Sequence, residues 1–198
     1  RSFNRAVALL HSFWYAEAEK AFAEVASTDA SCAMAHWGVA MTYFHPLWAP
    51  PTPVDLKNGS AAAERAVSVG AKTERERDYI QAIWIFYQDS DKLDHKTRAK
   101  AYEKAMEQVY LRNPDDKEAA IFYALALDAT APETDKTYAQ QRKAGGILNK
   151  SAPQLPDHPG IAHYLIHSYD FPPRATLGLP AARSYAKIAE SSPHALHM

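Results

Sequence analysis

The stretch YAEAEKAFAEVASTDA (residues 15–30) carries the spacing that decides the fold. Ala18 is followed by Phe22 and Val25, four and seven residues later, and by Ala30 in a turn twelve residues later. Apolar residues at these intervals share one face of an α-helix. The stretch therefore predicts an amphipathic helix that ends in a turn.

The same spacing recurs twice further along the chain. In AYEKAMEQVYLRNP (101–114) and LPAARSYAKIAESSP (179–193), two apolar residues and then a turn residue follow Tyr102 and Ala181 at the same intervals. Each turn is followed by a second helix-like segment, CAMAHWGVAMTYF, KEAAIFYALALD or HALHM. Glycine is scarce and the prolines cluster between these segments, where they interrupt helices. The pattern predicts an all-α array of antiparallel helix pairs, one domain over 1–198.

These markers resemble tetratricopeptide repeats, with Ala, Phe or Tyr, an aliphatic residue and Pro spaced as in the second helix of that family. The resemblance implies a superhelical solenoid of helical hairpins with a concave groove. The segment 55–95 departs from the pattern and is expected to be a degenerate part of the array, and 151–160 is expected to be a proline-rich loop.

Longer strings, including FNRAVALLHSFWYAEAEKAF and AHYLIHSYD, resemble a bacterial group of secreted or periplasmic repeat proteins without an established activity. This resemblance implies a periplasmic or extracellular location, with the cytoplasm left open. The chain starts at Arg1 and stops at Met198 within an expected helix, so we expect a processed or partial chain.

Composition excludes several classes of function. The net charge is −1, which gives no basic excess for nucleic acid or an anionic membrane surface. No apolar run approaches the ~20 residues of a membrane span. Cys32 is the single cysteine, so the chain has no internal disulfide.

The histidines suggest a metal site. His163 and His197 each lie four residues after a proline, and in the repeat register they align with Glu118 along the predicted groove. His163 and His167 share a helical face, as do His194 and His197 if the last helix continues. The predicted metal ligands are His163, His167, His194, His197 and Glu118, with His158 and Asp170 as supporting residues.

Neutral imidazoles with one carboxylate suit Zn²⁺ or Cu²⁺. The alternative is that these histidines are polar surface residues or hydrogen-bonded core residues with nothing bound. A zinc protease is not expected, because HYLIH lacks the glutamate that such a helix carries after its first histidine.

A second set of residues near the start is rich in aromatic rings. As a ligand-binding surface in the groove it would stack on a peptide, a sugar or an aromatic ligand, and the alternative is that these rings simply pack two repeats together. Its members are His11, His36, His45, Trp37, Tyr43 and Trp48.

Two functions follow from these patterns. The first is a scaffold that binds a protein or peptide, or other copies of itself head to tail, with the histidine cluster as a metal site. The second is a Cu- or Zn-dependent enzyme that uses the histidines with Glu118 or Asp170 as acid or base.

Overall fold

The computed structural model describes residues 1–47 and 49–198 and is helical, as predicted. The elements are α1 (Ser2–His11), α2 (Tyr15–Thr28), α3 (Ala33–Thr42), α4 (Pro53–Val69), α5 (Glu74–Tyr87), α6 (His95–Arg112), α7 (Lys117–Ala129), α8 (Ala139–Ser151), the 3₁₀ turn η1 (Ala152–Gln154), α9 (Pro159–Tyr169), α10 (Ala175–Ile188) and α11 (Pro193–His197).

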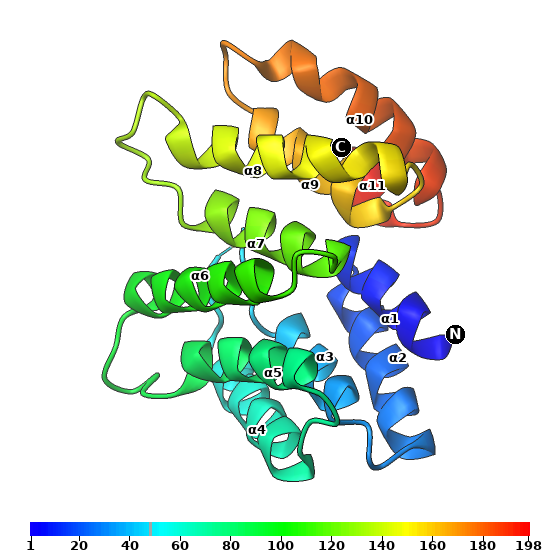
Figure 1. Cartoon of the computed structure of the whole chain (residues 1–198), viewed down its shortest axis with the longest axis vertical. Coiled ribbons are helices and arrows are strands. Elements are labelled where there is room, and N and C mark those ends of the chain that lie inside the picture. The colour runs from blue at the N-terminus through cyan, green and yellow to red at the C-terminus, as the bar shows by residue number, and fades with distance from the viewer. Residues whose placement is uncertain (48) are drawn as a thin grey trace.

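The three marked stretches form α2, α6 and α10, and the segments after their turns form α3, α7 and α11. Each helix packs against the next one along the chain, as antiparallel pairs require (Figure 1). Prolines stand in the first turns of α4, α9 and α11, where the missing N–H costs no intrahelical bond. Pro180 lies inside α10 and is an exception that the pattern did not predict.

The segment 55–95, where the repeat markers fade, still forms regular helices. Both α4 and α5 begin with a capping box, Thr52 with Asp55 and Thr73 with Glu76. The predicted loop 151–160 contains η1 and the first residues of α9.

The array curls so that its two ends touch. Helix α1 packs against α3 and also against α9, and Figure 1 shows the blue α1 beneath the group formed by α9 and α11. The odd-numbered helices α1, α3, α5, α7 and α9 therefore surround a common interior. The tetratricopeptide resemblance predicted a superhelix with a concave groove and did not predict this contact between the first and fifth helix pairs.

Gly160 allows the approach of α9 to α1. A Cβ atom at this position would lie 2.6 Å from Nδ1 and 2.8 Å from Cγ of His11, so no larger residue fits without displacing that ring. Large rings that are almost fully buried, including Phe122 and Tyr164, pack beside it. This packing fixes where the ends of α1 and α9 meet.

None of the helices in the described part of the chain is both long and apolar enough to cross a lipid bilayer.

Candidate functional site: a three-histidine cluster and a neighbouring cavity

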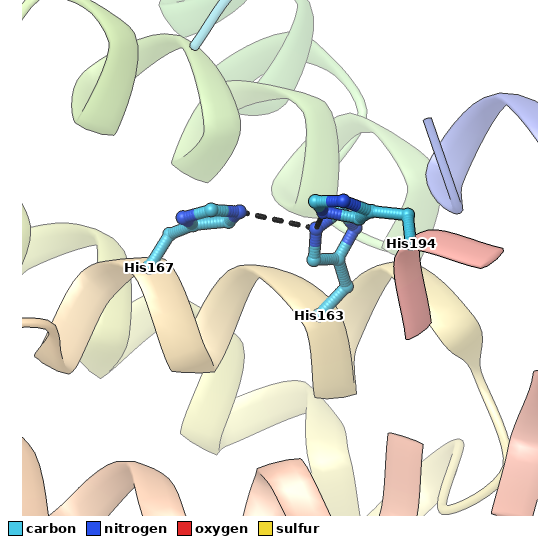
Figure 2. A group of neighbouring side chains, drawn as sticks. All are labelled: His163, His167 and His194. Carbon is cyan, nitrogen blue, oxygen red and sulfur yellow. Dashed lines mark hydrogen bonds between the residues drawn. The ribbon is translucent and has the colours of Figure 1, made fainter. Parts of the chain in front are cut away.

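Three histidines converge where α9, α11 and the end of α1 meet. His163 and His167 lie one turn apart on α9, and His194 lies in the first turn of α11 (Figure 2). The Nε2 atom of His163 is 2.9 Å from Nε2 of His194 and 3.1 Å from Nε2 of His167. The three ligand atoms lie within 4.8 Å of one another, so the group is geometrically able to hold a metal ion.

The hydrogen bond at the far side of the His163 ring fixes its tautomer. Nδ1 lies 2.6 Å from the backbone carbonyl oxygen of His11. Because a carbonyl can only accept, Nδ1 carries the proton and donates it. The Nε2 atom of the neutral ring then carries no proton. Its lone pair is directed at the other two imidazoles, as a metal ligand requires.

Aromatic rings hold the cluster in place. Phe13 contacts His163, His167 and His194, with ring centroids 4.4, 6.0 and 5.6 Å away. Tyr185 stacks on His163 at 4.8 Å with an angle of 6° between the planes. Phe13 adopts a φ of 52°, which is strained for a residue with a side chain and places the ring over the cluster.

Burial keeps the three imidazoles neutral. It is the main cause that lowers the pKa of His163 well below 6.5, that of His167 to about 4, and that of His194. Neighbouring imidazoles lower the pKa values of His163 and His167 further, while the charge of Asp170 raises that of His167. Neutral imidazole is the form that binds metal, so protons do not compete at pH 7.

A hollow reaches the cluster beside His194. It has a volume of about 340 Å³ and is lined by Phe13, Tyr15, His45 and His194. The hydroxyl of Tyr15 is buried without a hydrogen-bond partner, and burial raises its pKa well above 10. His45 has a φ of 49°, the second strained residue at this hollow.

Glu118 belongs to a different group, with His11 and His158. Its Oε2 atom is 2.8 Å from Nε2 of His11, and its Oε1 atom is 3.0 Å from Nε2 of His158. The other nitrogen of His11, Nδ1, is 2.9 Å from the hydroxyl of Tyr164. The two histidines hold the pKa of Glu118 well below its usual range, against the opposing effect of its burial.

This second group is close enough to hold a metal ion, but its hydrogen bonds occupy His11. Burial lowers the pKa of His11, so the ring is neutral at pH 7. The carboxylate of Glu118 accepts a hydrogen bond from His11, which places the proton of the ring on Nε2. The hydroxyl of Tyr164 then donates a hydrogen bond to Nδ1 of the same ring. His11 has no lone pair left for a metal, whereas His163 has one.

The structure thus divides the predicted ligand set. It brings His163, His167 and His194 together and places Glu118 and His158 in the second group. His197 is exposed and belongs to neither group.

The predicted aromatic surface is divided as well. His11 and Trp37 line a cavity of about 680 Å³, and His45 lines the hollow beside His194. Tyr43 donates to Glu19, and His36 is half-buried on α3 and lines neither space. Trp48 lies outside the described residues.

Several residues of the site carry no signal in the sequence. In the sequence, Phe13, Tyr164 and Tyr185 are indistinguishable from ordinary core aromatic residues. The carbonyl of His11 accepts a hydrogen bond from His163, which lies 152 positions away in the sequence. Pairing across such distances depends on how the array curls, which no local spacing encodes.

Comparison with known proteins finds no match: no protein-family model, no curated protein and no solved structure matches this chain. The tetratricopeptide resemblance therefore remains a prediction from the residues themselves.

Proposed function

We propose that this protein binds a transition metal ion, Zn²⁺ or Cu²⁺, through His163, His167 and His194. The observation that carries the proposal is the lone pair of His163 Nε2, fixed by the His11 carbonyl and facing two further imidazole nitrogens. Two imidazoles within about 3 Å of one lone pair cannot both donate good hydrogen bonds to it. A cation at the centre satisfies all three rings.

The spacing of the nitrogens supports a tetrahedral ion. Zn–N bonds of about 2.0–2.1 Å place two nitrogens of such a site about 3.3–3.4 Å apart. The 2.9 and 3.1 Å distances that involve Nε2 of His163 need to lengthen by only a few tenths of an ångström, and the third pair, His167 and His194, lies within 4.8 Å. Three neutral histidines and an open fourth position form a ligand set that Zn²⁺ accepts.

Isothermal titration with Zn²⁺ and with Cu²⁺ tests this function on tag-free protein dialysed against EDTA. We expect one tightly bound ion per chain, and a loss of at least about tenfold in affinity for His163→Ala and His194→Ala. His197→Ala is the matched control, because His197 is exposed on the same helix as His194. Glu118→Gln should also retain the ion. Unchanged binding by folded His163→Ala and His194→Ala would reject the site.

A catalytic role is a second candidate, favoured by the hollow beside His194. An enzyme needs an open coordination position and a group that transfers protons. Tyr15 and His45 line this hollow, whereas Glu118 belongs to the other group and Asp170 is exposed. Adding azide to the Co²⁺-loaded protein should change its visible spectrum if the fourth position is open. An unchanged spectrum would favour a purely structural ion.

The scaffold role in binding a protein, a peptide or further copies of the chain remains a prediction from the repeat pattern.

A further inference from the structure

A second cavity lies inside the curl of the array, apart from the three-histidine cluster. It measures about 680 Å³ and takes its lining from α1, α3, α5, α7 and α9 and from the residues that cap α3 and α9. A space shared by five helix pairs is part of the architecture and not a gap between two neighbours. Its volume is in the range of sites for small organic ligands.

Aromatic rings form much of the cavity wall. Phe3, Trp37, Tyr79 and Phe122 all line it. Trp37 stands edge-on to Tyr79 and to Phe122, with ring centroids 5.6 and 5.4 Å apart, so the rings brace one another. Faces of aromatic rings attract cations as well as apolar groups.

A carboxylate stands at the base of the cavity. The side chain of Glu118 is 32 % exposed, and both its oxygens are held by imidazoles, one of them the neutral His11. The arginine among the described lining residues is Arg75. Its Nε atom lies 2.6 Å from Oδ2 of Asp116, so its guanidinium is already paired. The charge of Arg75 also interacts with Glu118, but the ion-pair partners of Glu118 among the described residues are His11 and His158.

Two buried ring nitrogens of lining residues have no hydrogen-bond partner. They are Nδ1 of His158 and Nε1 of Trp37. Nε2 of His158 donates to Glu118, so Nδ1 is the nitrogen of this ring that is left without a partner. An unpaired buried polar atom is costly unless something binds to it. The carboxylate of Glu118 can accept from a ligand that donates, and the indole N–H of Trp37 can donate to an oxygen on such a ligand.

We propose that this cavity binds an organic ammonium ion with an apolar or aromatic body. The ammonium group donates to the carboxylate of Glu118, and the body packs against Phe3, Trp37 and Phe122. A metal ion fits less well, because both nitrogens of His11 are engaged in hydrogen bonds.

Ligand-observed NMR titration tests the proposal with three probes of nearly the same shape: 2-phenylethylamine, the neutral 2-phenylethanol and the anionic phenylacetate. All titrations contain EDTA, so the outcome does not depend on the metal site. We expect the amine to bind at least about tenfold more tightly than the alcohol, as a charge-assisted hydrogen bond implies, and phenylacetate to bind weakest.

Variants locate the binding. Glu118→Gln should reduce affinity for the amine about tenfold or more and leave the alcohol unchanged, whereas Glu24→Gln, at an exposed position on α2, should change neither. Phe3→Ala, at a half-buried wall position, should weaken the amine and the alcohol alike, and it covers the case in which Glu118→Gln does not fold. Failure of the amine to bind, equal binding of the three probes, or an amine affinity unaffected by both cavity variants would overturn the proposal.

Discussion

Lowering the pH of the metal-free protein from 7 to 5 should weaken the fold measurably through His167. Burial lowers the pKa of this imidazole to about 4 in the folded chain, against 6.5 in its ordinary state. At pH 7 the ring is neutral in both states. Below pH 6.5 the unfolded chain takes up a proton that the folded chain takes up only near pH 4, so stability is lost as the pH falls.

The size of the loss follows from the two pKa values. At pH 5 the unfolded ring is almost fully protonated and the folded ring about one-tenth protonated, which corresponds to about 2 kcal/mol. Below pH 4 the loss levels off at about 3 kcal/mol. Glu118 contributes little in the window from pH 7 to 5, because its lowered pKa matters only below the ordinary value of 4.5.

Urea unfolding at both pH values, in EDTA, measures this contribution. His167→Gln removes the titrating ring, so the difference in unfolding free energy between pH 7 and pH 5 should shrink by about 2 kcal/mol relative to the wild type. Any cost of the substitution that is independent of pH cancels in this difference. His197→Gln, at an exposed position, should leave the difference unchanged. The same pH dependence in wild type and His167→Gln would refute the burial of a neutral imidazole at this position.

Two further substitutions probe the packing that builds the site. Gly160→Ala places a Cβ atom against the ring of His11 and should destabilise the chain by about 1–3 kcal/mol in urea, whereas Gly146→Ala has open space within α8 and should stabilise it by about 0.5–1 kcal/mol. Equal effects at the two glycines would contradict the close approach of α9 to α1. Phe13→Ala removes the ring that covers the three histidines and should speed the transfer of Zn²⁺ to a chelator about tenfold; an unchanged rate would show that the ring does not shield the ion.

The helical fold could be predicted because its signals are local. The spacing after Ala18, Tyr102 and Ala181 reports which face of each helix is buried, and the turn residues report where pairs are joined. The structure confirms helices at all three places. The segment 55–95 lost its repeat markers but kept its helix caps, at Thr73 for example, and caps and propensity suffice for a helix to form there.

The curl of the array could not be predicted in the same way. Whether α1 meets α9 depends on small rotations between successive helix pairs that accumulate along the chain. Gly160 is one position that permits this contact, yet glycine also occurs where no other helix approaches, as at Gly146 within α8. Repeat register therefore aligned His163 with His197, whereas the structure pairs His163 with His194 and with the end of α1.

The chemistry of each histidine depends on its partner and not on its own position in a motif. His163 faces a backbone carbonyl through Nδ1, which frees Nε2 for a metal. His11 faces a carboxylate through Nε2 and a hydroxyl through Nδ1, so the same side chain becomes a proton-bearing support for Glu118. The partner that decides between these roles comes from 107 to 153 residues away. Sequence reasoning could thus gather the histidines of a metal site, but assigning Glu118 to that site required knowing which atoms each ring meets.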